Sequence, residues 1–277
     1  MKVLVLGTGT STGVPVPCCT CATCTSNNPK NKRLRTSIYL SFGAAFEHGV
    51  LIDTSTDLRQ QALRYELPSV GAVLFTHTHA DHVFGIDDLR CFNFAQRSVI
   101  PVYASEQSAC ELRTKFSYCF DTPDRYEGGA PPKLLLQELK PYQVLRLGTV
   151  DILPLPVFHG RTEVFGFRMG NFAYITDCSF IPEQTREHLH GLEVLLLDGL
   201  RERPHKTHFT LEQAVAEIEL IRPERTYLTH ISHELDHDAG NERLRELTTL
   251  PVELAYDGLE FEVPSFSPEH ASKPNIT

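Results

Sequence analysis

The stretch Thr76-His-Thr-His-Ala-Asp-His82 decides the fold of this 277-residue chain. It packs four side chains that can bind metals, His77, His79, Asp81 and His82, into six positions. Neither a helix nor a strand turns all four to one side, so they must leave a turn. The apolar run Val-Gly-Ala-Val-Leu-Phe directly before it is typical of a buried strand. We therefore expect the four side chains on the loop beyond the carboxyl end of a strand, where α/β proteins place their chemistry.

The spacing within this stretch indicates two metal ions. His77 and His79 are alternate residues, so in extended backbone they point the same way and can share one ion. Asp81 and His82 lie past the bend and can reach a second ion. Imidazole and carboxylate ligands suit manganese, zinc, iron and nickel, which leaves the metal open. A surface histidine cluster or a single structural zinc is the other interpretation, but such a site rarely combines three histidines and an aspartate in one turn.

Three further ligand-type residues follow strand-like segments. His159 ends the apolar run 150–158, Asp177 follows 172–176, and His230 follows 226–229. Each alone is compatible with an ordinary loop residue. Together they repeat the geometry of the first stretch and predict a hydrolytic centre with two metals.

At this point the chain resembles the metallo-β-lactamase superfamily of metal-dependent hydrolases, from Gly7 to about Gly258, and Leu51-Ile-Asp53 matches its first motif. The resemblance implies which residues bind which ion. The first metal would be held by His77, His79 and His159, the second by Asp81, His82 and His230, and Asp177 would bridge the two. Asp53 would support the ligand loop from behind; the alternative is an aspartate that ends a strand and starts a turn.

A second cluster of ligands lies near the amino terminus. Cys19, Cys21 and Cys24 form a C-x-C-x2-C pattern, which is compact enough for three thiolates to bind one soft ion. His233 is the best candidate for a fourth ligand because it follows His230 by three residues. We therefore predict a structural zinc that braces the catalytic loop. Buried or disulfide-bonded cysteines are the alternative.

These residues narrow the resemblance. The segment from Gly7 to Pro15, the cysteines after it and Thr229-His-Ile-Ser-His233 resemble the cyclic phosphodiesterase family of the carbon-phosphorus lyase pathway. That family hydrolyses 5-phosphoribosyl 1,2-cyclic phosphate with a catalytic metal pair, typically manganese, and a separate structural zinc. His208 matches a family histidine that assists phosphoryl chemistry; a solvated histidine just before a helix is the alternative. His205 has no matching role.

The expected chemistry is attack on phosphorus by a hydroxide that bridges the two metals. We expect His208, Asp81 and Asp177 to be the catalytic residues, with His208 giving a proton to the departing oxygen. Thr210 and Gln213 fit a capping box, so a helix should begin just after His208. The free amides at that helix start favour an anionic substrate.

Apolar patterns predict an α/β fold with the αββα architecture, in which two mixed β-sheets are flanked by helices. Strands are expected at 2–6, 37–42, 50–52, 72–75, 99–103, 150–157, 164–169, 172–176, 193–197 and 225–229, and helices near 56–66, 106–119, 183–190, 210–221 and 241–248. A single domain is expected over residues 1–263, with a cysteine-rich zinc-binding loop at 18–24 and a mobile tail at 264–277. The segment 104–149, with Phe116, Tyr118, Phe120 and Tyr126, is either a substrate lid or a packed insertion.

The charge and composition of the chain indicate its substrate class and its location in the cell. The net charge of −9 disfavours long nucleic acids, which usually need a basic surface, so a small anionic phosphodiester is the expected substrate. The basic stretch 30–35 is either a solvated loop or a site for the substrate's terminal phosphate. No segment is apolar enough to span a membrane, and eight cysteines without a secretory signal predict a cytoplasmic protein. The oligomeric state is left open, a homodimer included.

Other functions share the metal motif. A transfer RNA 3'-processing nuclease would be expected to carry a basic, Gly/Pro-rich arm, which the sequence lacks. Thioesterases remain an alternative, whereas a flavo-diiron enzyme is disfavoured because His79 stands where that family has glutamate. A non-catalytic metal-dependent binding protein is the alternative from a different class. Gly7-x-Gly9-x3-Gly13 lacks the spacing of a nucleotide-binding motif and is expected to be a tight turn.

Overall fold

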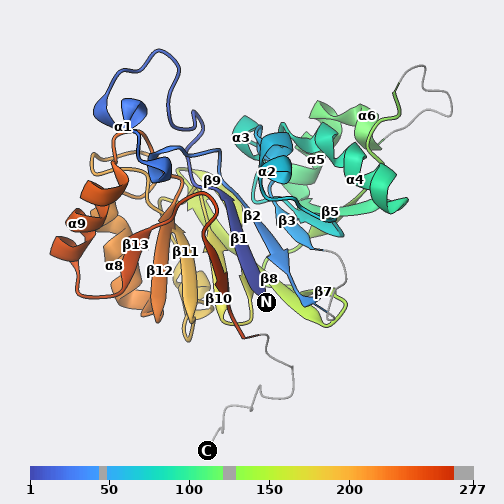
Figure 1. The fold of residues 1–277 in the computed structure, drawn as a ribbon. Helices are drawn as coiled ribbons and strands as arrows, with labels where there is room; N and C mark the ends of the chain where they lie inside the picture. The colour runs from blue at the N-terminus through green and yellow to red at the C-terminus, as the bar shows by residue number, and fades with distance from the viewer. Residues whose placement is uncertain (44–48, 121–128, 265–277) are drawn as a thin grey trace, which may run out of the picture.

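The computed structural model describes residues 1–43, 49–120 and 129–264, in which two β-sheets of seven strands lie face to face (Figure 1). The first sheet has the order β14-β1-β2-β3-β4-β5-β6 and the second has the order β13-β12-β11-β10-β9-β8-β7. Helices cover both outer faces. The predicted αββα sandwich of two mixed sheets is confirmed.

The first sheet combines antiparallel and parallel pairs. Its strands are β1 (Lys2–Gly7), β2 (Ser37–Ser41), β3 (Val50–Ile52), β4 (Ala72–Leu74), β5 (Ile100–Ser105), β6 (Leu134–Leu139) and β14 (Glu260–Glu262). β1 is antiparallel to both β2 and β14, while β3 to β6 run parallel. The carboxyl ends of β3, β4 and β5 therefore meet at one edge of the sheet.

The second sheet has the same mixed character. Its strands are β7 (Leu145–Leu147), β8 (Val150–His159), β9 (Thr162–Met169), β10 (Phe172–Ile175), β11 (Val194–Asp198), β12 (Arg225–Thr229) and β13 (Val252–Leu254). β7 to β10 are antiparallel, and β10 to β13 are parallel. This sheet also brings several carboxyl ends to one edge.

Helices form the two outer layers, with short helices in the loops above the sheets. On the first sheet lie α2 (Leu58–Arg64), α4 (Leu89–Gln96), α5 (Glu106–Lys115) and α6 (Ser117–Phe120); on the second lie α7 (Glu183–Glu187), α8 (Leu211–Ile221) and α9 (His237–Leu247). The loops carry α1 (Ala22–Thr25), η1 (Pro29–Asn31), α3 (Ala80–Val83) and η3 (Ile86–Asp88).

Strand alternation explains the layers. Along β1, Val3 and Val5 face the second sheet, where Phe165 and Phe167 of β9 meet them in one core between the sheets. Leu4 and Leu6 point the other way, into a core beneath the helices of the first sheet. A third core lies between the second sheet and α7 to α9. Three apolar cores thus separate the four layers.

The structure departs from the predicted elements mainly at short or exposed segments. Strands β6, β7, β13 and β14 and helix α4 were not predicted. β6 is the edge strand of the first sheet and its side chains are largely exposed, so its apolar alternation is weak. The helix expected at 106–119 breaks near Phe116 into α5 and α6. α9 begins at His237 rather than 241, because Asp236 caps it by accepting two backbone amides.

The described parts of the segment 104–149, residues 104–120 and 129–149, belong to the body of the fold. They contribute β6 to the first sheet, and Phe116, Tyr118 and Phe120 pack against the core beneath the helices. Tyr126 lies outside the described residues. The packed insertion is therefore the better interpretation of this segment.

The glycine-rich loop after β1 is the tight turn that was expected. A Cβ on Gly7 would collide with the carbonyl oxygen of Arg35, and one on Gly9 would lie 2.9 Å from the carbonyl oxygen of Arg33. Gly13 has a φ of 63°, which glycine adopts without strain. The glycines thus let two chain segments approach closely.

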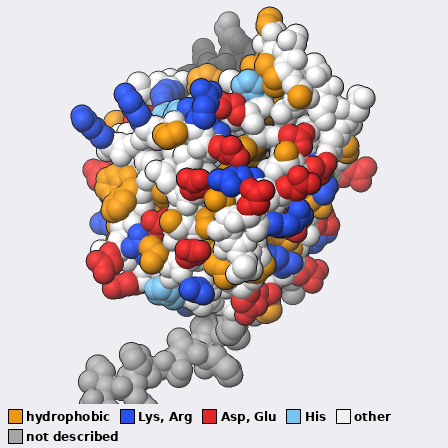
Figure 2. All heavy atoms as spheres, turned by 90° about the vertical axis from the view of Figure 1, so that its left-hand side faces the viewer, with side chains coloured by type: hydrophobic (Ala, Val, Ile, Leu, Met, Phe, Trp, Pro, Cys, Tyr) orange, Lys and Arg blue, Asp and Glu red, His pale blue; other side chains and the backbone are white. Residues whose placement is uncertain are grey.

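Charge on one face of the molecule is mixed. On the side that carries α8 and α9, acidic and basic side chains are interspersed (Figure 2). Arg243, for example, lies 3.0 Å from Glu212 and 3.0 Å from Glu246. Among the described residues, no helix combines the length and hydropathy needed to cross a membrane. The single domain at 1–263 stays a prediction, and the tail beyond Pro264 lies outside the described residues.

Candidate metal-dependent active site

The signature loop leaves β4 and enters the short helix α3. His79 occupies the N-cap position of α3, and Asp81 and His82 lie in its first turn. This is the bend that the spacing required. His77 is 5% exposed, Asp81 7% and His82 0%, whereas His79 is exposed. The loop therefore offers three buried ligands and one at the surface of the site.

Three residues reach the same place from the second sheet. His159 is the last residue of β8, Asp177 lies two residues beyond β10, and His230 directly follows β12. Asp177 and His230 have φ angles of 52° and 60°, and Asp53, after β3, has 63°. Left-handed backbone is unusual outside glycine and clusters at functional sites. The strands β3, β10 and β12 thus each lead into a sharp turn that redirects a polar side chain.

Asp177 lies at the centre of the group. Its Oδ1 is 3.1 Å from Nε2 of His82 and 3.3 Å from Nε2 of His230. Its Oδ2 is 3.7 Å from Nε2 of His77. The two oxygens of one carboxylate therefore face different histidines, as a bridging ligand requires.

The ligand atoms fall into sets that share Asp177. One set is Asp81, His82, Asp177 and His230, a second is His77, His79 and Asp177, and in each the ligand atoms lie within 4.8 Å of one another. His159 forms a third set with Asp177 and His208 rather than with His77. Its ring centroid still lies 5.1 Å from that of His79 and 5.7 Å from that of His77. The structure thus brings all seven predicted dimetal ligands together.

Unpartnered nitrogens test whether these residues fit metal ions. Nε2 of His77, His82 and His230 is buried without a hydrogen-bond partner among the described residues. A buried polar atom left unpaired costs about 1–3 kcal/mol, so three in one place need an explanation. Metal coordination would satisfy all three at once. The donor set of imidazoles and carboxylates suits divalent first-row metals.

Hydrogen bonds behind the ligands fix which nitrogen faces the centre. Nδ1 of His82 lies 2.8 Å from Oδ2 of Asp53, and Asp53 also accepts bonds from the backbone amide and hydroxyl of Thr76. Nδ1 of His159 lies 2.8 Å from the carbonyl oxygen of Thr207, to which it donates a hydrogen bond. In both residues Nε2 is left for a metal, which is how proteins usually orient metal-binding histidines.

The charges in the centre depend strongly on one another. Burial alone would raise the pKa of Asp177, but His230, His82 and His77 hold it well below its usual value. Burial alone would lower the pKa of His82, but Asp177, Asp81 and Asp53 raise it well above its usual value. The carboxylates thus favour a positive charge on His82, and a bound cation would replace that proton.

His208 lies beside the centre, in the loop between β11 and α8. It is 7% exposed, and its Nε2 is 3.9 Å from Oδ2 of Asp177. Its Nδ1 lies 2.7 Å from Oδ2 of Asp198. Burial would lower the pKa of His208, but Asp198 raises it to about 9. Asp198 thus favours the protonated ring, whose Nε2 faces the centre.

Asp198 is a site residue that the sequence analysis missed. It is the last residue of β11 and is completely buried. The signal was present, because Asp198 follows the apolar run Val-Leu-Leu-Leu just as the other site residues follow their strands. Applying the strand-end criterion to every apolar run would have found it.

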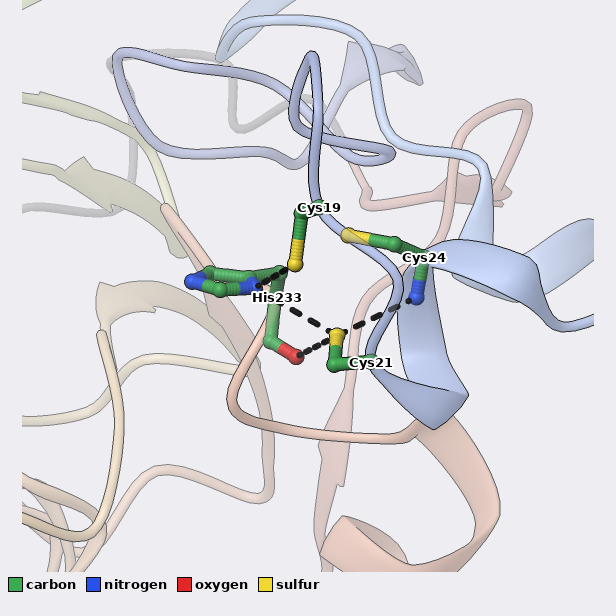
Figure 3. A group of neighbouring side chains, drawn as sticks. All are labelled: Cys19, Cys21, Cys24 and His233. Atoms are coloured by element: carbon green, nitrogen blue, oxygen red, sulfur yellow. Dashed lines mark hydrogen bonds between the residues drawn. The ribbon is translucent and has the colours of Figure 1, made fainter.

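The cysteine cluster lies at the same edge of the molecule, in the loop that carries α1 (Figure 3). The thiols of Cys19 and Cys21 are 3.3 and 3.4 Å from Nδ1 of His233. With Cys24, the four ligand atoms lie within 4.8 Å of one another. The backbone amide of Cys24 and the ring of His233 lower the pKa of Cys21 to about 6, which favours the thiolate. The predicted fourth ligand is thus in place, and three sulfurs with one imidazole suit zinc.

The basic stretch 30–35 supports the site from behind. Arg33 is 1% exposed and donates to the carbonyl oxygens of Ser232 and Leu235, at 3.0 and 2.8 Å. Nη1 of Arg35 lies 2.9 Å from Asp57. The two interpretations offered for this stretch, a solvated loop or a phosphate site, are therefore both wrong for Arg33. It holds the loop that carries His230 and His233.

Comparisons with known proteins agree with this geometry. A family model described as a beta-lactamase superfamily domain matches residues 48–231. A diphosphatase from the PhnP family superposes with a TM-score of 0.84 and 39% identity, covering 94% of this chain and 96% of that one. The Zn(2+)-bound PqqB from Methylobacterium extorquens superposes with a TM-score of 0.77 and 20% identity, covering 95% and 100%. At that identity the second likeness shows the fold alone.

A curated relative carries a different activity in its name. An octanoyltransferase from Porphyromonas gingivalis is 37% identical over 261 residues. The match covers 94% of this chain and 51% of the relative, so the chain spans about half the length of that protein. The transferase activity belongs to a protein about twice as long.

Proposed function

This chain belongs to the beta-lactamase superfamily, and we propose that it is a metal-dependent phosphodiesterase that hydrolyses a small cyclic phosphodiester such as 5-phosphoribosyl 1,2-cyclic phosphate. The superfamily and the buried His–Asp centre make the chain a metal-dependent hydrolase. The observation that carries the finer proposal is His208, a cationic imidazole whose Nε2 faces Asp177. The 39% identical diphosphatase supports phosphoryl chemistry.

We assign His77, His79 and His159 to one divalent ion, Asp81, His82 and His230 to a second, and Asp177 to both. Manganese or zinc is proposed, and iron and nickel fit the same donors. When bound, such ions activate a water molecule and neutralise phosphoryl oxygens. Asp53 and Thr207 keep two of the imidazoles in the tautomer that leaves Nε2 free.

His208 acts as the general acid in this proposal. Its Nε2–H gives a proton to the departing sugar oxygen, or stabilises the negative charge there. Asp198 keeps the proton on the ring at neutral pH and fixes its orientation through Nδ1. Asp81, buried between His82 and His230, keeps these two imidazoles in position through contacts of 3.4 and 3.5 Å. For the cyclic ribose substrate the product is a ribose that carries phosphates at positions 1 and 5.

The substrate is proposed to be small. The net charge of −9 and the mixed charges on the face of α8 and α9 provide little attraction for a polynucleotide (Figure 2). A precursor transfer RNA is therefore disfavoured. The location in the cell is proposed to be the cytoplasm, since free thiols are kept reduced there.

Thioester hydrolysis is the second candidate. The 37% identical relative named an octanoyltransferase favours an acyl substrate. A two-metal centre can serve acyl and phosphoryl transfer alike, because superfamily folds host many chemistries. A cationic general acid is more useful to a departing alkoxide than to a thiolate, which leaves without a proton.

A substrate screen tests the proposal. The metal-reconstituted protein is offered 5-phosphoribosyl 1,2-cyclic phosphate, cyclic nucleotides, precursor transfer RNA and an octanoyl thioester, and kcat/KM is measured for each. We expect the cyclic ribose phosphate to be the best substrate. The His208→Ala variant, with both metals retained, serves as the control and should lose turnover. Faster hydrolysis of the thioester than of every phosphodiester would contradict the proposal.

A further inference from the structure

The loop between β11 and α8 has an exposed tip that is nevertheless firmly held. Arg201 donates to the carbonyl oxygens of Arg203 and Pro204, at 3.2 and 3.3 Å, and to Oε1 of Glu234 at 2.8 Å. Arg203 donates to both oxygens of Glu234 at 2.8 Å. The bonds from these arginines lower the pKa of Glu234 to about 2, so it stays ionised. The tip is thus fastened to the loop that carries His230 and His233.

His205 lies on this tip and is exposed. Its Nδ1 is 3.4 Å from the backbone amide of Thr207, which can only donate, so a neutral ring carries its proton on Nε2. Among the described residues, Nε2 has no hydrogen-bond partner. The carbonyl oxygen of the same Thr207 accepts a hydrogen bond from Nδ1 of His159. This contact links the position of His205 to the metal centre. An exposed imidazole is thus held with a free donor.

The ring of His205 lies on the outward side of His208. Its ring centroid lies 5.1 Å from that of His208, and Nε2 of His208 lies 3.9 Å from Asp177. Asp177 and His208 are buried, whereas His205 is exposed, so the three residues lead outward from the centre. A substrate with its phosphorus at the centre and its departing oxygen at His208 would extend the rest of its leaving group past His205.

We propose that His205 is a substrate-binding residue whose Nε2–H donates a hydrogen bond to an oxygen on the leaving-group side of the substrate. This inference rests on the proposed function, because the role of His208 defines which side is the leaving group. The acceptor is a sugar hydroxyl or a phosphate oxygen. His205 thereby selects substrates whose leaving group carries such an oxygen, and it takes no part in proton transfer.

Binding affinities measured by titration calorimetry test the proposal independently of turnover. The metal-reconstituted protein is titrated with ribose 5-phosphate and with methyl phosphate, which lacks the sugar. We expect His205→Ala to weaken ribose 5-phosphate binding about three- to ten-fold, as the loss of one neutral hydrogen bond predicts. His205→Gln, which keeps an N–H donor, should recover part of that loss. His190→Ala, at an exposed histidine on the turn after α7, is the matched control and should bind like the wild type.

The two probes show whether the acceptor lies on the leaving-group side. Weakening for ribose 5-phosphate alone supports an acceptor on the leaving-group side, because methyl phosphate carries no oxygen there beyond the phosphate. Equal weakening for both probes would place His205 at the phosphate bound in the centre and would contradict the inference. The pH profile for hydrolysis of bis(p-nitrophenyl) phosphate should be unchanged in His205→Ala, which shows that His208 is undisturbed. Unchanged affinity of His205→Ala for both probes, or no binding of either probe by the wild type, overturns the inference. Absence of phosphodiesterase turnover in the wild type instead overturns the proposed function.

Discussion

Asp177 presents one carboxylate oxygen to each half of the metal centre, and it does so from a left-handed turn. Aspartate and asparagine adopt this backbone conformation more easily than most residues, because their short polar side chains can hydrogen-bond locally. The hydroxyl of Thr176 supplies such a bond to Oδ1 at 2.9 Å. The identity of this residue therefore serves both the turn and the metals.

Asp177→Asn is expected to keep the fold and lose the chemistry. Asparagine tolerates the turn but lacks the negative charge that two cations need, so hydrolysis of bis(p-nitrophenyl) phosphate should fall by roughly a hundred-fold or more. Elemental analysis should find fewer than two site metals per chain. Asp151→Asn, at a half-exposed carboxylate paired with Arg146, is the control. Wild-type rates in Asp177→Asn would refute the bridging role.

Asp198→Asn is expected to change the pH dependence. Asp198 raises the pKa of His208 to about 9, so the protonated acid is present below that pH and is lost as the pH rises through it. Without the carboxylate, burial dominates and the pKa falls. The alkaline limit of kcat should therefore move to lower pH, measured with a substrate that has a poor leaving group. An unmoved limit would mean that another group carries the proton.

The convergence of the seven proposed metal ligands could be predicted because the loop or residue that holds them follows an apolar run, and the strands formed by these runs end at the same edge. His208 was predicted from a family position, whereas Asp198 was overlooked although it fits the strand-end pattern. The role of Thr207 could not be predicted, because a backbone carbonyl carries no signal in the residue type. The burial of Arg33 was also hidden, since a basic run usually predicts solvent exposure.

At the scale of elements, helix α8 fixes the general acid. The predicted capping box is present. The hydroxyl of Thr210 accepts a hydrogen bond from the backbone amide of Gln213, and the side-chain oxygen of Gln213 accepts one from the backbone amide of Thr210. Leu211, Ala214 and Ile218 anchor the helix in the core of the second sheet. His208 therefore sits two residues before a rigid N-cap. Strands with strong apolar patterns could be predicted, whereas edge strands such as β6 and β13 are partly exposed, so their apolar patterns are weak.

Thr210→Ala should lower the free energy of unfolding by about 1 kcal/mol, as the loss of an N-cap usually does. Urea denaturation monitored by circular dichroism measures this change. Glu219→Ala, at an exposed position of the same helix, controls for helix propensity and should change stability by less than about 0.5 kcal/mol. An equal effect of both substitutions would show that the capping box contributes nothing.

At the scale of the whole molecule, the proposed metal ligands come from segments that are distant in the sequence. The signature loop belongs to the first sheet, whereas His159, Asp177 and His230 belong to the second. The cysteine loop is joined in the same way to His233. Bound ions would therefore hold the two sheets and the amino-terminal loop together at one edge.

Removal of the metals should lower the melting temperature, because an ion that binds only the folded state stabilises it, by ~2.7 kcal/mol at a hundred-fold excess over Kd. Thermal melts before and after treatment with a chelator measure the change. Cys21→Ser should lose one zinc per chain while the active-site metals are retained, and it should show a smaller shift on chelation. A Cys21→Ser protein that kept all its zinc would contradict the structural site.

The pairing of β1 with β14 determines where the chain can be extended. Lys2 lies opposite Glu262, and the amino group of Met1 donates to the carbonyl oxygen of Val263 at 2.8 Å. In Figure 1 the amino terminus lies at the end of the sheets opposite α1 and α3, the helices that carry Cys24, Asp81 and His82. A second domain tethered at the amino terminus would leave the edge that carries the candidate site open. The architecture is therefore compatible with fusion, and a reporter protein could be attached there without obstructing the substrate.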